Sequence, residues 1–426
     1  MRALYSLLWY LALPFLPLRL AWRGRREPGY REHVGERFGA YSSSVGAPLI
    51  WIHAVSLGET RAATPLIERL QRARPDATLL VTHMTATGRA AGRALFGDRV
   101  VQAWLPYDVP FAVRRFLRHF RPQAGLLMET ELWPNLVAEA HAAGVPLFVV
   151  NGRLSARSAA GYARVGSMTR TMLRAFAGIA TQSASDAERF AALGASAPVV
   201  TGNLKFDLDI PTSALALGDD LRRLFGGARP VWVAGSTRDG EEALILDALA
   251  RRALPPRTLT VIVPRHPQRF DAVAQLLSER GLRHIRRSAN KRVNADVDFV
   301  LGDSMGEMLA YYRAADVAFV GGSLVPLGGQ NLIEPIALGR PTLIGPYTFN
   351  FAEATANATA AGAARAVANA DALLDEASAL LNSPSERARM SEAALAFHAM
   401  HRGATTRLWD WLAPQIGGAA SRAGGD

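Results

Sequence analysis

The chain has 426 residues, of which 49% are hydrophobic and 20% charged, and its formal net charge is +11. This length suits two domains of about 200 residues each, and the composition excludes an intrinsically disordered chain. The absence of cysteine excludes disulfides, thiolate metal sites and cysteine nucleophiles, while the positive charge favours anionic partners such as lipid headgroups, phosphorylated substrates or nucleic acid.

An apolar segment begins the chain. Residues 4–20 are almost wholly apolar and are followed by four arginines between residues 23 and 31. A cleaved signal peptide carries its positive charge before the apolar segment, so the order here is largely reversed. We predict an uncleaved membrane anchor over residues 1–22 that either crosses the membrane at a tilt or lies in its interface, with the bulk of the chain on the cytoplasmic side. The alternative is a buried core helix.

From Pro48 onward, short apolar runs alternate with segments of helix length. In the first half these runs lie at residues 49–53, 78–82, 100–104, 125–128, 146–150, 178–181 and 198–200. This pattern is typical of a parallel sheet with helices on both faces. We therefore predict a first, Rossmann-like domain over residues 23–207.

The pattern pauses over residues 208–230, which are polar and rich in glycine and are predicted to form a linker. It resumes with apolar runs at residues 231–234, 259–263, 299–301, 317–320 and 341–344. We predict a second domain over residues 231–412 and a tail over 413–426. The last helical stretch, residues 385–412, either stays in the second domain or returns to the first.

The predicted fold class is thus α/β, with two doubly wound, Rossmann-like domains. Ligands of such sheets bind beyond the carboxyl ends of the strands. Two halves of this kind, facing each other, predict a binding site in a central cleft between them.

Acidic residues follow two strands of the first half. Glu59 lies at the start of the helix after the first strand, where a carboxylate either accepts a proton from an attacking hydroxyl or complements the helix dipole. Glu129 and Glu131 follow the fourth strand, just before Pro134, as catalytic or positioning groups or as caps of the next helix. Lys205, after the last strand, is either a surface lysine or a cation for a phosphate or carboxylate.

The second half holds the candidates for nucleotide binding. Arg265 and His266 end a strand beside a helix start, and glycine-rich turns lie at 302–308, 321–323 and 328–335. Glycines let backbone N–H groups approach an anion, and a helix N-terminus favours negative charge. A glutamate within the last of these turns is expected to accept hydrogen bonds from ribose hydroxyls.

Other kinds of site are not supported. The nine histidines are scattered, no cluster has the spacing of metal ligands, and the sequence contains neither a P-loop nor a Gly-x-Ser-x-Gly elbow. We therefore expect no metal, and the hydrolase and ATPase interpretations are disfavoured. Basic runs with interleaved aromatic residues are also lacking, so no nucleic-acid partner is expected.

Two stretches carry a specific resemblance to a known family. Residues 129–135 read Glu-Thr-Glu-Leu-Trp-Pro-Asn, and residues 151–158 read Asn-Gly-Arg-Leu-Ser-Ala-Arg-Ser. With further matches in order through both halves, the sequence resembles the 3-deoxy-D-manno-octulosonic acid (Kdo) transferases of Gram-negative lipid A assembly.

The resemblance implies a GT-B fold with an N-terminal membrane anchor at the inner membrane. It implies CMP-Kdo as the donor, the tetra-acylated lipid IVA as the acceptor in lipopolysaccharide core assembly, and no cofactor. By the same resemblance Glu59 is the general base, and Glu129 and Lys205 stabilise the transition state. The implied CMP-binding residues are Pro264, Arg265, Met305, Gly306, Glu307, Asn331, Leu332, Ile333 and Glu334. Of these, Ile333 departs slightly from the usual family pattern.

The expected mechanism is a direct displacement that inverts the anomeric centre. Glu59 takes the proton of the acceptor hydroxyl, while Lys205, Arg265 and the helix N-terminus at Asn331 stabilise the departing CMP. Arginines between residues 23 and 37 are expected to touch the phosphates of the acceptor. The rival interpretations are a UDP-sugar transferase or epimerase on the same fold, and a membrane-peripheral scaffold that contacts nucleic acid.

Overall fold

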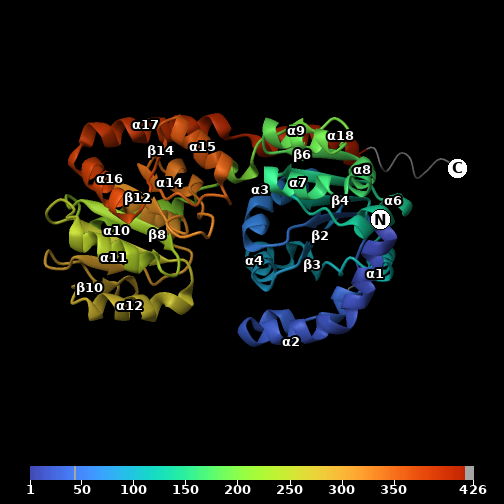
Figure 1. The fold of residues 1–426 in the computed structure, drawn as a ribbon, viewed down its shortest axis with the longest axis horizontal. Coiled ribbons are helices and arrows are strands. Elements are labelled where there is room, and N and C mark those ends of the chain that lie inside the picture. The colour runs from blue at the N-terminus through green and yellow to red at the C-terminus, as the bar shows by residue number, and fades with distance from the viewer. Residues whose placement is uncertain (43–44, 418–426) are drawn as a thin grey trace. The chain divides into compact units, whose positions relative to one another are not determined.

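The computed structural model describes residues 1–42 and 45–417, and the chain divides into two compact units (Figure 1). The first unit comprises Met1–Asp207 with Gly403–Asp426, and the second comprises Leu208–Arg402. Each unit is built around its own seven-stranded sheet.

The sheet of the first unit is entirely parallel, with strand order β3-β2-β1-β4-β5-β6-β7. Its strands are β1 (Leu49–His53), β2 (Thr78–His83), β3 (Val101–Trp104), β4 (Ala124–Met128), β5 (Leu147–Gly152), β6 (Gly178–Thr181) and β7 (Val199–Val200). All seven overlap the apolar runs of the sequence. Because parallel strands are covered by helices on both faces, they read as continuous apolar runs.

Alternate side chains of these strands enter two separate cores. Ile50 and Ile52 of β1 pack in one core, and Leu49 and Trp51 in the other. The first core is closed by α3 (Leu57–Ala73), α4 (Ala86–Phe96) and α18 (Ala404–Gly417). The second core is closed by α5 (Pro110–Phe120), α6 (Pro134–Ala142), α8 (Gly166–Arg174) and α9 (Ala184–Ala192), and α7 (Ala156–Ala163) adds partly buried side chains.

The sheet of the second unit is also parallel, with order β10-β11-β9-β8-β12-β13-β14. Its strands are β8 (Val231–Thr237), β9 (Leu259–Pro264), β10 (His284–Arg286), β11 (Phe299–Leu301), β12 (Val317–Val320), β13 (Thr342–Ile344) and β14 (Ala364–Ala366). The edge strands β10 and β14 were not predicted from the sequence. Each has three residues and lacks a fully buried apolar run, so it carries little periodic signal.

The helices of the second unit lie before β8 and after most of its strands. They are α10 (Thr212–Phe225), α11 (Glu241–Arg251), α12 (Phe270–Glu279), α13 (Met308–Ala314), α14 (Ile333–Ala337), α15 (Ala352–Ala360), α16 (Ala370–Asn382) and α17 (Pro384–His401). As Figure 1 shows, α16 and α17 follow one another at the end of the unit.

The linker predicted over residues 208–230 differs from the structure. Helix α10 occupies most of this segment, and its Leu221 and Phe225 are buried in a core shared with α13 and strands β8 and β9. The helix is amphipathic, with polar residues between its apolar ones, and a proline and a glycine flank its ends. The polar composition of this segment, with Pro and Gly at its ends, therefore led to the prediction of a linker where the structure has a core helix.

The second domain ends before the predicted residue 412, and the alternative that the last helical stretch returns to the first unit holds for its second part. The helical stretch at residues 385–412 is broken at Gly403, which has a φ of +86°, and α18 belongs to the first unit. The carboxylate of Asp207 accepts hydrogen bonds from Gly403 N at 2.6 Å and Thr405 N at 2.5 Å. Helix α18 extends to Gly417, so the predicted tail begins as helix, and residues 418–426 lie outside the described residues.

The N-terminal segment forms α1 (Arg2–Ala12), the short turn η1 (Leu13–Phe15) and α2 (Leu16–Arg26). One side contacts the first unit: Leu16 and Leu20 are buried, and the ring of Trp9 lies 5.8 Å from that of Tyr107. The other side exposes large apolar residues, namely Leu4, Leu7, Leu8, Leu11, Phe15, Leu18 and Trp22. Residues Arg2–Arg25 are long and apolar enough to cross a membrane, and only 11% of the most apolar window is buried. A buried core helix is therefore not what the structure shows.

Candidate active site

Glu59 is held in place by the start of α3. Ser56 caps this helix: its side chain accepts a hydrogen bond from Glu59 N, and its hydroxyl donates to Glu59 Oε1 at 2.9 Å. Glu59 Oε2 accepts from Val55 N, also at 2.9 Å. This arrangement differs from a capping box in that the carboxylate accepts from the N–H of Val55 and not from that of Ser56, but Glu59 does serve the helix terminus. Burial and then the charge of Glu129 raise the pKa of Glu59 to about 8.

The segment after β4 places the next carboxylate. Glu129 has a φ of +57°, a left-handed conformation, and its N–H donates to Val150 O at 3.0 Å. The hydroxyl of Thr130 donates to the backbone carbonyl of Arg153. These contacts hold the Glu129 segment against the stretch that follows β5.

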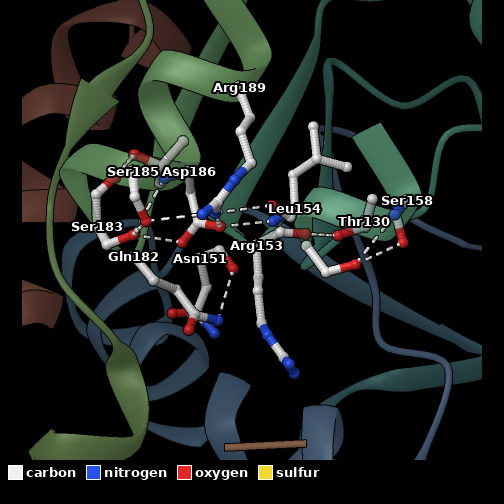
Figure 2. A network of polar contacts seen from close by, with 12 residues as sticks. Thr130, Asn151, Arg153, Leu154, Ser158, Gln182, Ser183, Ser185, Asp186 and Arg189 are labelled. Carbon is white, nitrogen blue, oxygen red and sulfur yellow. Dashed lines mark hydrogen bonds and ion pairs between the residues drawn. The ribbon is translucent and has the colours of Figure 1, made fainter. Parts of the chain in front are cut away.

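That stretch is part of the specific motif at residues 151–158, and a hydrogen-bond network fixes it (Figure 2). Leu154 N donates to Asp186 Oδ1 at 2.7 Å, and Arg189 donates to the carbonyl of Leu154 at 3.1 Å. The side chain of Asn151 accepts from Leu204 N at 3.0 Å. The motif thus scaffolds both the Glu129 segment and the segment of Lys205.

Glu129 and Lys205 meet directly. Nζ of Lys205 lies 2.9 Å from Glu129 Oε1, and the two side chains are 18% and 21% exposed. Lys205 comes from the short turn η5 (Leu204–Asp207), which follows β7. Lys205 and Glu129 thus come from the ends of two strands, and the charge of Glu129 also acts on Glu59 at the end of a third.

Glu131 joins the same cluster. Its Oε2 accepts a hydrogen bond from Trp133 Nε1 at 2.7 Å and lies 4.0 Å from Nε2 of the buried His53. Burial raises the pKa of Glu131 to about 7, with a smaller contribution from the charge of Glu129, while the Trp133 hydrogen bond opposes the shift. Sequence reasoning left Glu131 without a definite role and missed His53, whose only signal was a polar residue ending an apolar strand.

In the second unit, Arg265 lies beside the segment that enters α14. Its Nε is 3.3 Å from Gln330 Oε1, and its backbone N–H donates to Thr237 O at 2.9 Å. At the next turn, Asn331 Nδ2 donates to Glu334 Oε1 at 3.2 Å. Arg265 and the 330–334 segment thus lie close together within this unit.

The remaining predicted CMP-binding residues have different surroundings. Glu307 accepts from Ser304 Oγ at 2.6 Å and pairs with Arg287 at 3.2 Å, Gly306 has a φ of +82°, and Met305 is 57% exposed. Pro264 is the last residue of β9 and is buried. The side chains of Leu332 and Ile333 are wholly buried, so they pack in the protein core and only their backbone can face a ligand.

One glycine-rich turn, residues 321–323, does not offer its amides to an external anion. The N–H groups of Gly322, Ser323 and Leu324 donate to the buried Glu241 at 2.5, 3.0 and 2.9 Å. Arg238 N donates to the same carboxylate at 2.8 Å. The expectation of an anion-binding turn at this strand end was wrong, because the protein's own carboxylate occupies the amides.

The expected role of Arg37 is also contradicted. Its side chain is 2% exposed, and its guanidinium lies 3.9 Å from the ring centroid of Trp104. It is therefore unavailable to the phosphates of an acceptor. Among residues 1–42 and 45–417, no group of three or more acidic or histidine side chains could hold a metal ion.

Two family models match the chain. Residues 32–208 match the model described as 3-deoxy-D-manno-octulosonic-acid transferase (kdotransferase), and residues 278–397 match glycosyl transferases group 1. Their two regions fall mostly in the first and the second unit. The chain is therefore a glycosyltransferase.

The chain is 46% identical to the 3-deoxy-D-manno-octulosonic acid transferase of Bordetella pertussis, over 96% of this chain and 99% of that protein. It is 39% identical to the enzyme of the same name from Haemophilus influenzae, over 97% and 99%. Anabaena Alr3699/HepE in complex with UDP is 16% identical, with a TM-score of 0.59 over 87% of this chain and 99% of that one. This last likeness shows the fold alone and confirms the predicted GT-B class. By its sequence, this chain belongs to the 3-deoxy-D-manno-octulosonic acid transferase family.

Proposed function

We propose that this protein transfers Kdo from CMP-Kdo to lipid IVA by direct displacement, with inversion at the anomeric carbon and Glu59 as the general base. The observation that carries the proposal is the cluster of Glu59, Glu129 and Lys205 at the strand ends of the first unit. Family membership supports the Kdo group, and the resemblance to Kdo transferases supports the donor and the acceptor.

The base must take one proton from the attacking hydroxyl as the new C–O bond forms. A general base works best when its pKa lies near the operating pH. The pKa of Glu59, raised to about 8 by burial, meets this condition. Val55 N and the Ser56 hydroxyl hold the carboxylate in one orientation, which lowers the entropy lost on reaching the reactive geometry.

The departing CMP carries its own phosphate charge, so the leaving group does not need a proton. What it needs is a cation or N–H groups that stabilise the growing negative charge. We assign this task to Lys205, which Glu129 positions through their 2.9 Å contact, and to Arg265. Arg265, Met305, Gly306, Glu307 and the 331–334 segment are assigned to CMP, and no metal or cofactor is invoked.

The lipid acceptor requires the enzyme to work at a membrane. The apolar side of α1 and α2, with arginines at its C-terminal end, suits contact with the acyl region and the headgroups of a bilayer. We propose that this segment holds the protein at the inner membrane, with both units on the cytoplasmic side.

The test is transfer of Kdo from freshly made CMP-Kdo to lipid IVA by purified wild type and Glu59→Gln, with EDTA present. Loss of a general base predicts a decrease of roughly two or more orders of magnitude in the variant. Glu68→Gln is the matched control, because Glu68 is an exposed residue of the same helix. It should keep wild-type activity.

The outcomes separate the parts of the proposal. An active Glu59→Gln enzyme would show that Glu59 caps the helix and is not the general base. A wild type that needs divalent metal would overturn the metal-free mechanism. No transfer by wild type, with a melting temperature raised by UDP and not by CMP, would instead favour a UDP-sugar enzyme on the same fold.

A further inference from the structure

The mechanism above makes no use of Glu131, although its carboxyl faces a buried nitrogen of His53. His53 is wholly buried, and its Nε2 has no hydrogen-bond partner among the described residues. Buried polar atoms in proteins nearly always have a partner. This nitrogen therefore indicates that a hydrogen-bond donor approaches it at some stage.

The surroundings of the ring define which nitrogen carries the proton. Nδ1 of His53 lies 3.1 Å from the carbonyl oxygen of Thr82, which can only accept. It also lies 2.9 Å from the Thr82 hydroxyl, which accepts a hydrogen bond from Trp51 Nε1 at 2.7 Å. Nδ1 is therefore the protonated nitrogen, and Nε2 of the neutral ring is an acceptor. Burial lowers the pKa of His53 to about 3, so the ring stays neutral.

Glu131 is the group that can supply the missing donor. Its Oε2 lies 4.0 Å from Nε2, which is too long for a hydrogen bond but within reach of a small side-chain rotation. The same oxygen accepts from Trp133 Nε1. An ionised carboxylate only accepts, whereas a protonated carboxyl both accepts and donates and so satisfies Trp133 and His53 together.

The negative charge of the cluster also favours a protonated Glu131. Three carboxylates, Glu59, Glu129 and Glu131, share the site with one ammonium group, that of Lys205, which pairs with Glu129. The Tyr162 hydroxyl on α7 also faces this charge: its pKa is raised chiefly by burial and secondarily by Glu131. A donor whose sugar and phosphate are both anionic would add more negative charge, and like charges favour protonation of a neighbouring carboxyl.

We propose that Glu131 is a positioning residue that works in its protonated form, donating to His53 Nε2 and removing one negative charge from the site when the anionic donor binds. Its proton is not transferred in the reaction. This inference rests on the proposed function, because it assumes an anionic sugar donor and Glu59 as the base.

The variants Glu131→Gln and Glu131→Ala test it, with Glu68→Gln again as control. Glutamine has the donor and acceptor of a protonated carboxyl, so Glu131→Gln should keep most of the activity. Glu131→Ala leaves both neighbours without their partner and should lose roughly 100-fold in kcat/KM, as small misplacements in active sites do.

The pH profiles give a readout that a merely structural role would not move. In the free enzyme, Glu131 ionises below the pKa of Glu59 and helps to raise it. In Glu131→Gln the acid limb of kcat/KM should therefore move to lower pH, by on the order of one unit. The acid limb of kcat should stay in place, because in the donor complex the wild-type carboxyl is already protonated.

Infrared difference spectra of the CMP-Kdo complex report the proton directly, whatever the activity of the variants. Wild type should show a carboxylic-acid C=O band at neutral pH that is missing in Glu131→Gln. The proposal would be overturned by a Glu131→Gln enzyme as inactive as Glu131→Ala, by wild-type pH profiles in both variants, or by the absence of that band. An active Glu59→Gln enzyme would instead refute the base assignment, so the two failures are distinguishable.

Discussion

In each unit the helix after the first strand begins near a glutamate, and the two glutamates have opposite surroundings. Glu59 lies in the first turn of α3, after β1, and Glu241 is the first residue of α11, after β8. Glu241 is completely buried and accepts hydrogen bonds from four backbone N–H groups. Glu59 accepts from one backbone N–H and one hydroxyl, and other carboxylates lie near it.

The difference teaches that two buried glutamates at similar places in the fold differ in the number of their hydrogen-bond donors. Burial raises the pKa of both groups. At Glu241 the four amides stabilise the ionised form and tie the turn after β12 to α11, so the carboxylate is structural. Glu59 is buried with few donors and with like charges nearby, so its pKa rises to about 8, which suits the role of base that we propose for it.

The largest expected effect is on stability, in Glu241→Gln. The substitution places an NH2 group against two of the four backbone N–H groups and leaves them without an acceptor, which should cost about 3 kcal/mol or more. Glu59→Gln should change the free energy of unfolding by no more than about 1 kcal/mol, the usual value of a helix cap. Urea denaturation of both full-length variants measures the change in the free energy of unfolding. Equal losses in the two variants would contradict the difference between Glu241 and Glu59.

A smaller effect is expected in the pH dependence of stability. The folded-state pKa of Glu59 is about 8, well above its ordinary value of 4.5, so the folded protein holds this proton more tightly than the unfolded chain does. The resulting stabilisation is complete below the unfolded pKa and is lost as pH rises towards 8. Melting temperatures of wild type should therefore fall relative to Glu59→Gln between pH 5 and about 8. A constant difference across this range would show that the pKa of Glu59 is not raised.

The smallest effect is expected in Ser56→Ala, which removes the hydroxyl that donates to Glu59 Oε1. The loss of the cap should destabilise the first unit by about 1 kcal/mol. Because that hydrogen bond favours the ionised carboxylate, its removal should raise the pKa of Glu59, and the acid limb of kcat/KM should move to higher pH. Ser383→Ala, at the cap of α17 in the second unit, is the matched control and should leave the pH profile unchanged. An unchanged profile in Ser56→Ala itself would show that this hydroxyl does not tune Glu59.

Much of the architecture was predictable because both sheets are parallel and buried. Residues 49–53, 178–181, 299–301 and 317–320 were predicted as strands with the bounds that the structure has. The edge strands β10 and β14 and the helix α10 were not, since short edges and amphipathic helices near a domain boundary lack a continuous apolar run.

The sequence by itself determined the fold class, the family and three of the clustered residues: Glu59, Glu129 and Lys205 each follow an apolar strand, and parallel strands end at one edge of their sheet. Only the tertiary structure decided which donors and charges surround each carboxylate. Three of the four backbone donors of Glu241 come from the turn after β12, about 80 residues away, and Glu131 lies 4.0 Å from His53 on β1. Donors and charges act through space on the pKa of a group, and their positions are set by packing rather than by separation along the chain.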